Sequence, residues 1–273
     1  MTTRQTAERA IIKTYRKEIW NRFVEGVKQY ALLREGDRVC VCLSGGKDSV
    51  LLAKCLQQLQ RHSDFPFELR FLALDPGYNV ENRRLLRENC ETLGIPVVLR
   101  EANIFRYVET QEGSPCYLCA RMRRGYLYKE ARELGCNKIA LGHHFDDVIE
   151  TILISILYGA EVKTMMPKLH STHYPGMELI RPLYLVKEHD IVRWQNYCGL
   201  RFLSCACALE QQHEETGEAG KRARVKRLIA DLRKENDTVD SNIFHSVEDV
   251  NLETLLGYRK GERHTSFLDE YVE

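Results

Sequence analysis

Ser44-Gly45-Gly46-Lys47-Asp48-Ser49 is the stretch that decides how this chain folds. It follows the apolar run 38–43, which predicts a β-strand, and it precedes the apolar run 50–56, which predicts a helix. Two adjacent glycines let backbone N–H groups approach an anion closely, and a helix that starts here points the positive end of its dipole at the same anion. Lys47 adds a full charge and the two serines add hydroxyl donors. The stretch therefore predicts a phosphate-binding loop.

The residue spacing in this loop excludes a Walker A motif, which needs four residues between its first glycine and its Gly-Lys pair. SGGKDS instead resembles the PP-loop of the ATP-pyrophosphatase superfamily. The resemblance implies an enzyme that cleaves ATP between its α- and β-phosphates, leaves AMP on an activated oxygen and releases pyrophosphate. The alternative is an ordinary strand-to-helix turn that is rich in glycine.

Further strands are expected at residues 68–74, 96–99 and 138–141, and the helices between them at about 47–61, 81–93, 120–134 and 146–157. This alternation predicts an α/β fold, with a parallel sheet covered by helices on both faces. Ligands of such sheets bind at the carboxyl ends of the strands. The loop, Asp75 and residues 142–144 should therefore converge there, around ATP.

Three segments are expected along the chain. Residues 1–33 carry apolar side chains at helical spacing, residues 34–210 form the PP-loop domain, and residues 211–273 form a helical and polar tail. Beyond residue 159 the alternation weakens: 164–177 is expected as an irregular loop or loose hairpin, 180–183 as a short strand and 187–197 as a helix. No internal repeat is visible.

Composition limits the possible classes of protein. A chain of 273 residues that is 44% hydrophobic fits one α/β domain with appendages. It has no apolar run of membrane-spanning length, and residues 1–16 are too polar for a secretory signal, so we expect a cytoplasmic protein without membrane contact. Because 40 basic residues face 39 acidic ones, a nucleic-acid partner would have to be held by local patches.

Ten cysteines without a secretory signal favour metal-binding or catalytic thiols over disulfides. Six are interpreted as structural, because they lie in apolar segments or near helix ends: Cys40, Cys42, Cys55, Cys90, Cys136 and Cys198. Cys116 and Cys119 form a CxxC pair just ahead of three arginines, whose charge would lower the pKa values of the thiols. Such a pair is half of a zinc site, a redox pair or a pair of cluster ligands.

A second cysteine group, Cys205 and Cys207, lies 89 residues after Cys116. Cysteines two apart on an extended segment point to opposite faces, so one of them is expected to join a shared site. Three thiolates would hold a [4Fe-4S] cluster with one iron open to an outside ligand. The alternative is a structural zinc ion closed by all four cysteines.

At this point the sequence resembles one family closely. SGGKDS, the segment 115–128 that starts Pro-Cys-x-x-Cys, and Lys-Ile-Ala-Leu-Gly-His-His-Phe-Asp-Asp at 138–147 occur in the same order in the tRNA 2-thiocytidine synthetases, as do 158–159, 166–169 and 180–183. The match covers roughly residues 12–207. It implies a tRNA sulfurtransferase that adenylates the C2 oxygen of an anticodon-loop cytidine, position 32 of the tRNA, and replaces it with sulfur carried on a [4Fe-4S] cluster. It also implies a homodimer and a sulfur donor such as a cysteine desulfurase.

The same resemblance assigns the cluster ligands. Cys116 and Cys119 fall on the family's first two ligands, and Cys205 is by position the third. The family's Pro-Cys-x-x-Cys is here Ser204-Cys205-Ala206-Cys207, so Cys207 is a substitute candidate. A sister enzyme that thiolates or desulfurates another nucleobase stays open. The 2-thiouridine synthetases fit less well, because they carry terminal zinc-binding pairs and residues 1–30 contain neither cysteine nor histidine.

The remaining site residues are expected around ATP and Mg²⁺. Ser44, Gly45, Gly46 and Ser49 would hold the phosphates, with Lys47 and magnesium neutralising their charge. Asp48 is a candidate magnesium ligand and catalytic carboxylate, or a helix cap; Asp75 contacts ribose or metal, or shapes its Asp-Pro-Gly turn. The second strand end contributes Gly142, His143 and Asp147, next to His144 and Asp146, although these aspartates would also suit a helix N-terminus. The basic run 221–227 is a candidate contact for tRNA phosphates, or a solvated helix face.

Overall fold

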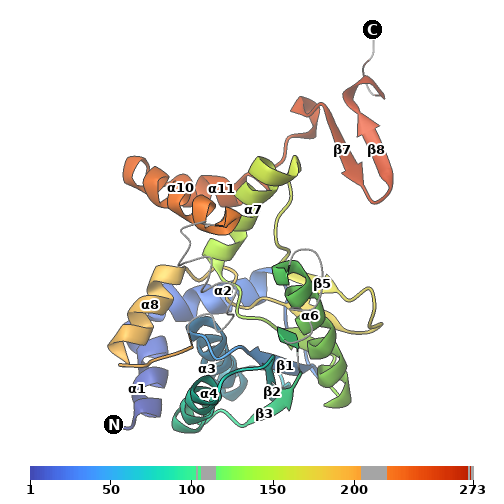
Figure 1. Ribbon diagram of the computed structural model, residues 1–273. Helices are drawn as coiled ribbons and strands as arrows, with labels where there is room; N and C mark the ends of the chain where they lie inside the picture. Colours follow the sequence, from blue (N-terminus) through green and yellow to red (C-terminus); the bar gives the residue numbers. More distant parts are fainter. Residues whose placement is uncertain (103, 106–114, 204–219, 270, 272–273) are drawn as a thin grey trace. The chain divides into compact units, whose positions relative to one another are not determined.

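The structure is a computed structural model that describes residues 1–102, 104–105, 115–203, 220–269 and 271, without the side chains of residues 115–117. The chain divides into two compact units (Figure 1). Unit 1 comprises Met1–Val148 and Met165–Gly220, and unit 2 comprises Ile149–Thr164 and Lys221–Glu273. The boundaries expected at 33/34 and 210/211 stay predictions, and the second lies outside the described residues.

Unit 1 is built on a six-stranded sheet in the order β3-β2-β1-β4-β6-β5. The strands are β1 (Arg38–Leu43), β2 (Glu68–Asp75), β3 (Val97–Glu101), β4 (Lys138–Ala140), β5 (Lys168–His170) and β6 (Glu178–Ile180). All neighbours are parallel except β5, which pairs antiparallel with β6. Because both faces of a parallel sheet are covered, the central strand β1 is apolar throughout its buried length.

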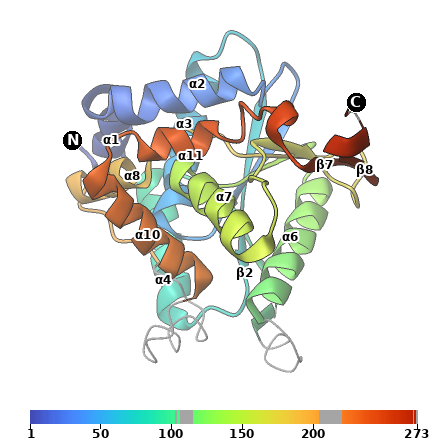
Figure 2. The ribbon, with the colours of Figure 1, turned by 90° about the horizontal axis from the view of Figure 1, so that it is seen from above.

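Helices cover both faces of this sheet, as predicted (Figure 2). Val39, Val41 and Leu43 of β1 pack toward α3 (Lys47–His62), α4 (Val80–Leu93) and α8 (Glu188–Tyr197). Cys40 and Cys42 alternate with them and face α6 (Pro115–Glu133) on the other side. The α/β class expected from the sequence is therefore confirmed.

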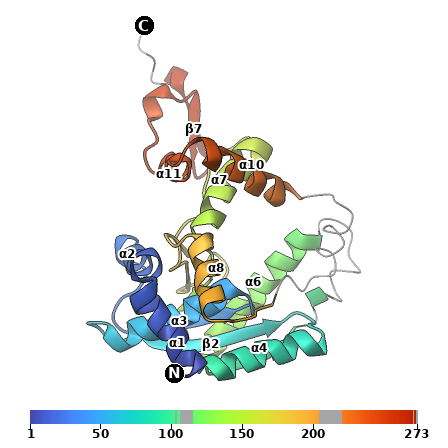
Figure 3. The same cartoon turned by 90° about the vertical axis from the view of Figure 1, so that its left-hand side faces the viewer.

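The N-terminal helical segment is less regular than its periodicity predicts. α1 (Thr3–Arg9) is followed by the π-helical segments η1 (Ala10–Thr14) and η2 (Arg16–Asn21) and by α2 (Arg22–Gln29). α2 ends at Gln29, whereas the helical pattern was expected to continue to residue 33, because Ala31 takes a positive φ of 46°. Figure 3 shows α8 beside this segment, where Trp194 Nε1 donates to the Ala7 carbonyl at 3.2 Å.

The stretch expected as an irregular loop or loose hairpin, 164–177, contains the short strand β5 and turns through Gly176, whose φ is +80°. Its return strand is β6, which starts earlier than expected, at Glu178, and ends at Ile180, the first residue of the expected strand 180–183. Pro182 comes two residues later, and proline cannot continue a sheet ladder.

Unit 2 contains α7 (Phe145–Gly159) from Ile149 onward, α10 (Lys221–Glu235), α11 (Val239–His245), the 3-10 turns η3 (Leu252–Thr254) and η4 (Phe267–Asp269), and the hairpin β7 (Gly257–Lys260) and β8 (Arg263–Ser266). α10 buries Val225 and Ile229. The hairpin turns over Gly261 and Glu262, and Gly261 takes a φ of +63°. No helix among the described residues is long and apolar enough to cross a membrane.

Candidate nucleotide and sulfur-transfer site

The topology places a ligand crevice next to β1. From β1 the chain runs outward through β2 to β3 and then crosses to β4 on the other side of β1, so the strand order reverses between β1 and β4. Parallel sheets bind ligands at such a point. The loop follows β1, Asp75 ends β2 and Gly142 follows β4. Leu43 of β1 lies opposite Ala73 of β2, and Val41 lies opposite Ala140 of β4. The carboxyl ends of these three strands therefore lie at the same edge of the sheet. The predicted convergence is confirmed.

The loop itself is held by serine hydroxyls. Ser44 N–H donates to Ser49 Oγ at 3.2 Å, the two Oγ atoms lie 3.2 Å apart, and Ser49 Oγ donates to the Gly46 carbonyl at 2.9 Å. Gly45 takes a φ of +81°, which favours glycine. α3 begins at Lys47 and no side chain caps it at Gly46, so first-turn N–H groups remain for an anionic ligand.

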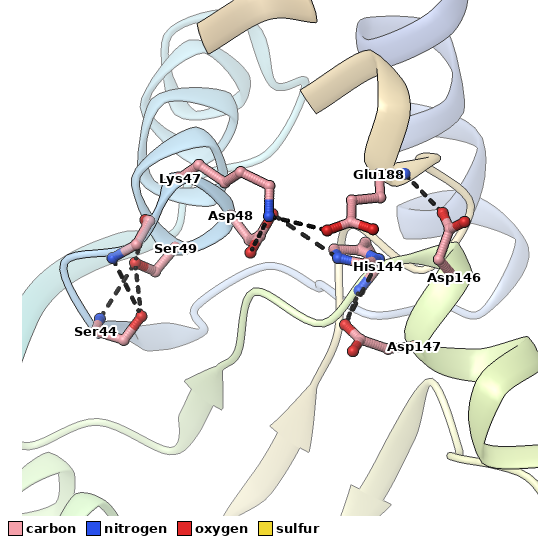
Figure 4. Close-up of polar contacts among 9 residues, drawn as sticks. Ser44, Lys47, Asp48, Ser49, His144, Asp146, Asp147 and Glu188 are labelled. Carbon is pink, nitrogen blue, oxygen red and sulfur yellow. Dashed lines mark hydrogen bonds and ion pairs between the residues drawn. The ribbon is translucent and has the colours of Figure 1, made fainter. Parts of the chain in front are cut away.

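Charged side chains gather in front of this loop (Figure 4). Lys47 Nζ lies 3.2 Å from Asp48 Oδ1 and 3.2 Å from Glu188 Oε1. Burial opposes the charge of Lys47, but the carboxylates of Asp48 and Glu188 outweigh it and raise the pKa of the amine. Burial also raises the pKa of Asp48, with the negative charge of Asp147 in the same direction and His144 and Lys47 against it. Lys47 therefore stays charged at neutral pH.

His144 is buried between two of these carboxylates. Its Nε2 lies 3.8 Å from Asp48 Oδ1 and its Nδ1 lies 3.6 Å from Asp147 Oδ2. Asp147 also accepts from the His144 backbone N–H at 3.1 Å, and Asp146 accepts from the Glu188 backbone N–H at 2.6 Å. Both aspartates thus bind backbone N–H groups at the starts of helices, which is the alternative role that the sequence suggested for them. Asp147 also contacts the ring of His144 in the site.

Asp75 is buried and occupied by its own turn. Its Oδ1 accepts from the backbone N–H groups of Gly77 at 2.9 Å and Tyr78 at 2.6 Å, and its Oδ2 lies 2.7 Å from Arg83 Nε. These contacts form the turn considered as the alternative for Asp75. The turn orients Tyr78, whose hydroxyl donates to the Ser44 carbonyl at 3.0 Å. A direct contact of Asp75 with ribose or metal stays a prediction.

His143 and Gly142 occupy different surroundings. Gly142 lies against the first turn of α3, at Asp48 and Ser49. The His143 side chain contacts the residue that follows β6, where its Nδ1 accepts from Arg181 Nε at 3.2 Å.

Of the four cysteines expected near a metal centre, the structure describes the side chain of Cys119, and the role of all four stays a prediction. Cys119 is half-buried on α6 and packs with the cluster of Leu74, Ala102 and Ile104 at the end of β2. Position 116 lies three residues earlier on the same helix. Cys205 and Cys207 lie outside the described residues. Leu203, two residues before Cys205, donates its N–H to the Gly45 carbonyl at 3.1 Å.

The six cysteines interpreted as structural are buried, apart from Cys198, which is half-buried. Burial raises the pKa of Cys90 and of Cys198 to about 11 and raises that of Cys55 further. Thiols with such pKa values are protonated at neutral pH and are poor metal ligands or nucleophiles.

The contacts of four site residues were not predicted from the sequence. Two of them, Glu188 and Tyr78, contact the loop through side chains that come from distant elements, and a third, Leu203, contacts it through its backbone. Arg181 holds His143. The motif Arg-Pro-Leu at 181–183 was a signal for the last of these, since it lies at the end of an expected strand and therefore at the ligand edge.

The residues in front of the loop fit a magnesium ion. Asp48 Oδ1 is buried and lies 3.2 Å from the Lys47 ammonium, but it accepts no hydrogen bond within the described part of the chain, and a magnesium ion would satisfy it. Three carboxylates surround Lys47 and His144, so a bound triphosphate needs further positive charge. Among the described residues no group of three His, Cys, Asp or Glu side chains is placed to hold a metal ion.

Fold and site together define an ATP-utilising enzyme of the PP-loop type, and the PP-loop domain family matches residues 15–214. The chain is 36% identical to the tRNA-cytidine(32) 2-sulfurtransferase of Anaeromyxobacter dehalogenans (strain 2CP-C), over 83% of this chain and 77% of that protein. It is also 36% identical to tRNA-cytidine(32) 2-sulfurtransferase 1 of Francisella philomiragia subsp. philomiragia, over 86% of this chain and 90% of that protein. The chain belongs to the tRNA-cytidine(32) 2-sulfurtransferase family, as its motifs indicated.

A solved structure shares the fold. The U34-tRNA thiolase NcsA from Methanococcus maripaludis, determined with its [4Fe-4S] cluster, superposes with a TM-score of 0.65 at 21% identity, covering 88% of this chain and 80% of that chain. At this identity the likeness concerns the fold alone.

Proposed function

We propose that this enzyme uses ATP to replace the C2 oxygen of cytidine 32 in tRNA with sulfur. The observation that supports the proposal most directly is the PP-loop at the sheet's ligand edge in a chain 36% identical to tRNA-cytidine(32) 2-sulfurtransferases over most of its length. The loop's geometry fits phosphates, and α6 brings Cys119 to the neighbouring strand end.

The first half-reaction turns a poor leaving group into a good one. The C2 oxygen of cytidine attacks the α-phosphorus of ATP, the bond between the α-phosphorus and the bridging oxygen breaks, and pyrophosphate leaves with the bridging electrons. The N–H groups at the start of α3 and the hydroxyls of Ser44 and Ser49 bind the phosphate oxygens. Lys47 would exchange its carboxylate partners for phosphate, and Asp48 would hold a magnesium ion, which would supply further positive charge to the phosphates.

In the second half-reaction a sulfur nucleophile adds to C2 and AMP leaves with the former cytidine oxygen. Cys116, Cys119 and a third cysteine, Cys205 or Cys207, would ligate a [4Fe-4S] cluster that supplies an iron site open to sulfide. The backbone contact of Leu203 with Gly45 is compatible with this assignment, because Cys205 follows Leu203 by two residues of chain and Cys207 by four.

The tRNA would be held through its phosphates. Within α10 five basic residues are exposed while Val225 and Ile229 are buried: Lys221, Arg222, Arg224, Lys226 and Arg227. Such a helix face suits a phosphate backbone. The proposal also includes a homodimer and a cysteine desulfurase as sulfur donor, both expected from the family resemblance.

The function is tested on anaerobically purified enzyme with unmodified tRNA, ATP, Mg²⁺ and sulfide. The expected product is 2-thiocytidine at position 32, detected by mass spectrometry of nuclease digests and absent without ATP. A tRNA carrying uridine at position 32 is the matched substrate control, and Cys116→Ala is the enzyme control. Sulfur on a different base would assign another substrate, and full activity of Cys116→Ala would refute the role of that cysteine.

A further inference from the structure

The tip of the β7–β8 hairpin (Figure 1) carries a concentration of positive charge. Lys260 lies directly opposite Arg263 next to the turn, and Arg259 lies opposite His264 one step further along the ladder. Residues opposite each other share a face of the ladder, and successive residues alternate between the two faces. The two pairs therefore belong to opposite faces, and all four residues are exposed. The tip thus presents three full positive charges and a histidine.

This arrangement opposes the stability of the hairpin. Like charges directly opposite each other in an antiparallel ladder are destabilising, and a two-stranded hairpin has little stability to lose. The hairpin's acidic residue, Glu262, lies in the turn, and within the described part of the chain neither Lys260 nor Arg263 forms an ion pair. Arg259 Nη2 lies 3.7 Å from Glu161 Oε2, an exposed contact that contributes little energy. The repulsion between the two outermost cations is therefore not offset by an ion pair with the residues described.

Protection of the hairpin's edges does not explain this pair. Charged side chains on exposed strands discourage edge-to-edge pairing with other chains, and lysine is common in that role. A glutamate opposite Lys260 would protect the edges equally well and would also stabilise the ladder through an opposite-charge contact. Two cations at these positions therefore need another reason. A bound anion provides one, because an anion between two cations replaces their repulsion with attraction.

The positive charge of unit 2 is concentrated in two elements. The unit contains more acidic than basic residues, yet every lysine and arginine in it except Lys163 belongs to α10 or to this hairpin. Lys163 Nζ pairs with Glu161 Oε1 at 3.1 Å. Charge that served solubility alone could be spread over the surface of the unit. Its concentration in two elements favours local contacts with a polyanion.

The other contacts of the hairpin single out Lys260 and Arg263. The ring of His264 lies over Gly257, two residues back along the ladder, where an added Cβ would come within 3.3 Å of its Cε1. Arg259 is already paired with the loop that follows α7. Lys260 and Arg263 are therefore the cations that the turn presents to a ligand.

We infer that the tip of the β7–β8 hairpin binds RNA phosphates, with Lys260 and Arg263 as the contacting residues. Phosphate oxygens accept hydrogen bonds from ammonium and guanidinium groups, and such contacts position a nucleic acid without reading its sequence. The inference rests on the proposed function for the identity of the nucleic acid, a tRNA. It adds a second tRNA contact to the one proposed for α10, and the charge arrangement behind it follows from the hairpin alone.

The test measures tRNA binding by the full-length protein over a salt series, without ATP or sulfide. A phosphate that binds a lysine or arginine releases counterions, so the double variant Lys260→Gln with Arg263→Gln should weaken binding and reduce the slope of log K against log salt by about 1.5. The matched control is the double variant Arg22→Gln with Arg84→Gln, because each of these exposed arginines already pairs with a glutamate of its own helix. The control should keep the wild-type slope.

A charge reversal separates binding from stability. Arg263→Glu places a carboxylate opposite Lys260, so its unfolding temperature should equal or exceed that of wild type. The same change brings a negative charge against the phosphates and should weaken tRNA binding more than Arg263→Gln does. If Arg263 served the fold alone, Arg263→Glu would leave tRNA binding unchanged, and the inference would fail.

An unchanged slope in Lys260→Gln with Arg263→Gln, or an equal reduction in the control, would also overturn the inference. Sedimentation with vesicles of phosphatidylcholine and phosphatidylserine tests another polyanionic surface. If the double variant loses vesicle binding but keeps the wild-type slope with tRNA, the tip binds lipid headgroups and the RNA contact is refuted. Because none of these measurements needs turnover, an enzyme that shows the reduced slope but forms no 2-thiocytidine would refute the proposed function and leave the phosphate contact standing.

Discussion

Gly142 lies directly against the backbone of Ser49: a Cβ at position 142 would come within 2.9 Å of the Ser49 nitrogen and 3.0 Å of the Asp48 carbonyl carbon. Both obstacles are backbone atoms of the first turn of α3, so a side chain there cannot be accommodated by a rotamer change. The end of β4 and the phosphate loop can approach this closely only because residue 142 is glycine.

Gly142→Ala is therefore expected to displace the start of α3 and weaken ATP binding by at least about tenfold, or about 1.4 kcal/mol. Isothermal titration calorimetry with a non-hydrolysable ATP analogue measures this. Gly159→Ala is the matched control, because a Cβ there meets no atom within 4 Å. Equal affinities of Gly142→Ala and wild type would show that the loop tolerates the displacement.

A second prediction concerns the ion pairs that hold the N-terminal helix. Lys54 is fully buried, and its Nζ lies 2.7 Å from Glu8 Oε1. Burial acts to raise the pKa of Glu8, but hydrogen bonds from Lys54, Arg61 and Arg4 outweigh it and lower the pKa from 4.5 to about 2. A carboxylate with a depressed folded-state pKa contributes stability above its unfolded pKa and loses it as pH falls through the folded one.

The contribution of Glu8 should be fully present above about pH 4.5 and gone near pH 2. At pH 7 Glu8→Gln is expected to lower the free energy of unfolding by about 2 kcal/mol, as for other hydrogen bonds to charged groups. Urea unfolding at several pH values measures both effects. Glu25→Gln, which removes an exposed partner of Arg22, should cost far less. A difference between Glu8→Gln and wild type that persists unchanged to pH 2 would contradict the linkage.

The phosphate loop could be predicted from sequence because its signals are local. Strand, double glycine and helix occupy one short segment, and the parallel topology then determines which other segments meet it. The same reasoning brought Gly142 and Asp147 to the site, and their contacts with Ser49 and His144 agree with it.

Glu188 could not be predicted in this way. It reaches Lys47 across 141 residues of sequence, through the docking of α8 against the N-terminal helices and α3. That docking depends on side-chain packing, such as Trp194 on Ala7, and leaves no periodic pattern at position 188. The β7–β8 hairpin was also missed, although the Gly-Glu pair between two short strands was a readable turn signal.

A third prediction separates the cluster ligands from the other thiols. Cys119→Ser should purify anaerobically with little iron and acid-labile sulfide, whereas wild type should carry about four of each, as a [4Fe-4S] cluster requires. Cys198→Ser is a matched control, since Cys198 is also half-buried but its pKa is raised to about 11. Iron, sulfide and zinc are measured together with the visible spectrum.

The same measurement on Cys205→Ala and Cys207→Ala identifies the third ligand, because only the ligand's loss should remove the cluster. Zinc without iron in the wild-type protein would instead support the structural-zinc alternative and remove the sulfur-carrier mechanism.

A fourth prediction concerns magnesium. Asp48 and Glu188 both form ion pairs with Lys47, and of these two carboxylates Asp48 has a buried oxygen, Oδ1, that accepts no hydrogen bond from the described residues. Asp48→Asn is therefore expected to raise the Mg²⁺ concentration for half-maximal ATP turnover by about tenfold or more. Glu188→Gln keeps that oxygen and should change the Mg²⁺ dependence much less. Equal shifts in the two variants would show that the ion responds to local charge and is not held by Asp48 in particular.

The last prediction assigns the basic face of α10 to tRNA. Lys221 and Arg227 are exposed at the start and middle of the helix, and a lysine or arginine that binds a phosphate releases a counterion from the RNA. The double variant Lys221→Gln with Arg227→Gln should weaken tRNA binding and reduce the slope of log K against log salt by about one to two, according to how many phosphates are contacted. Filter binding or anisotropy over a salt series measures the slope.

Lys234→Gln is the matched control on the same helix, because Lys234 already pairs with Asp231 at 2.7 Å. Its slope should remain that of wild type. If the double variant also keeps the wild-type slope, the run is a solvated helix face and the tRNA phosphates are bound elsewhere. A reduced slope with unchanged ATP affinity would place tRNA binding on α10 independently of the phosphate loop, since Lys221 and Arg227 are not part of that loop.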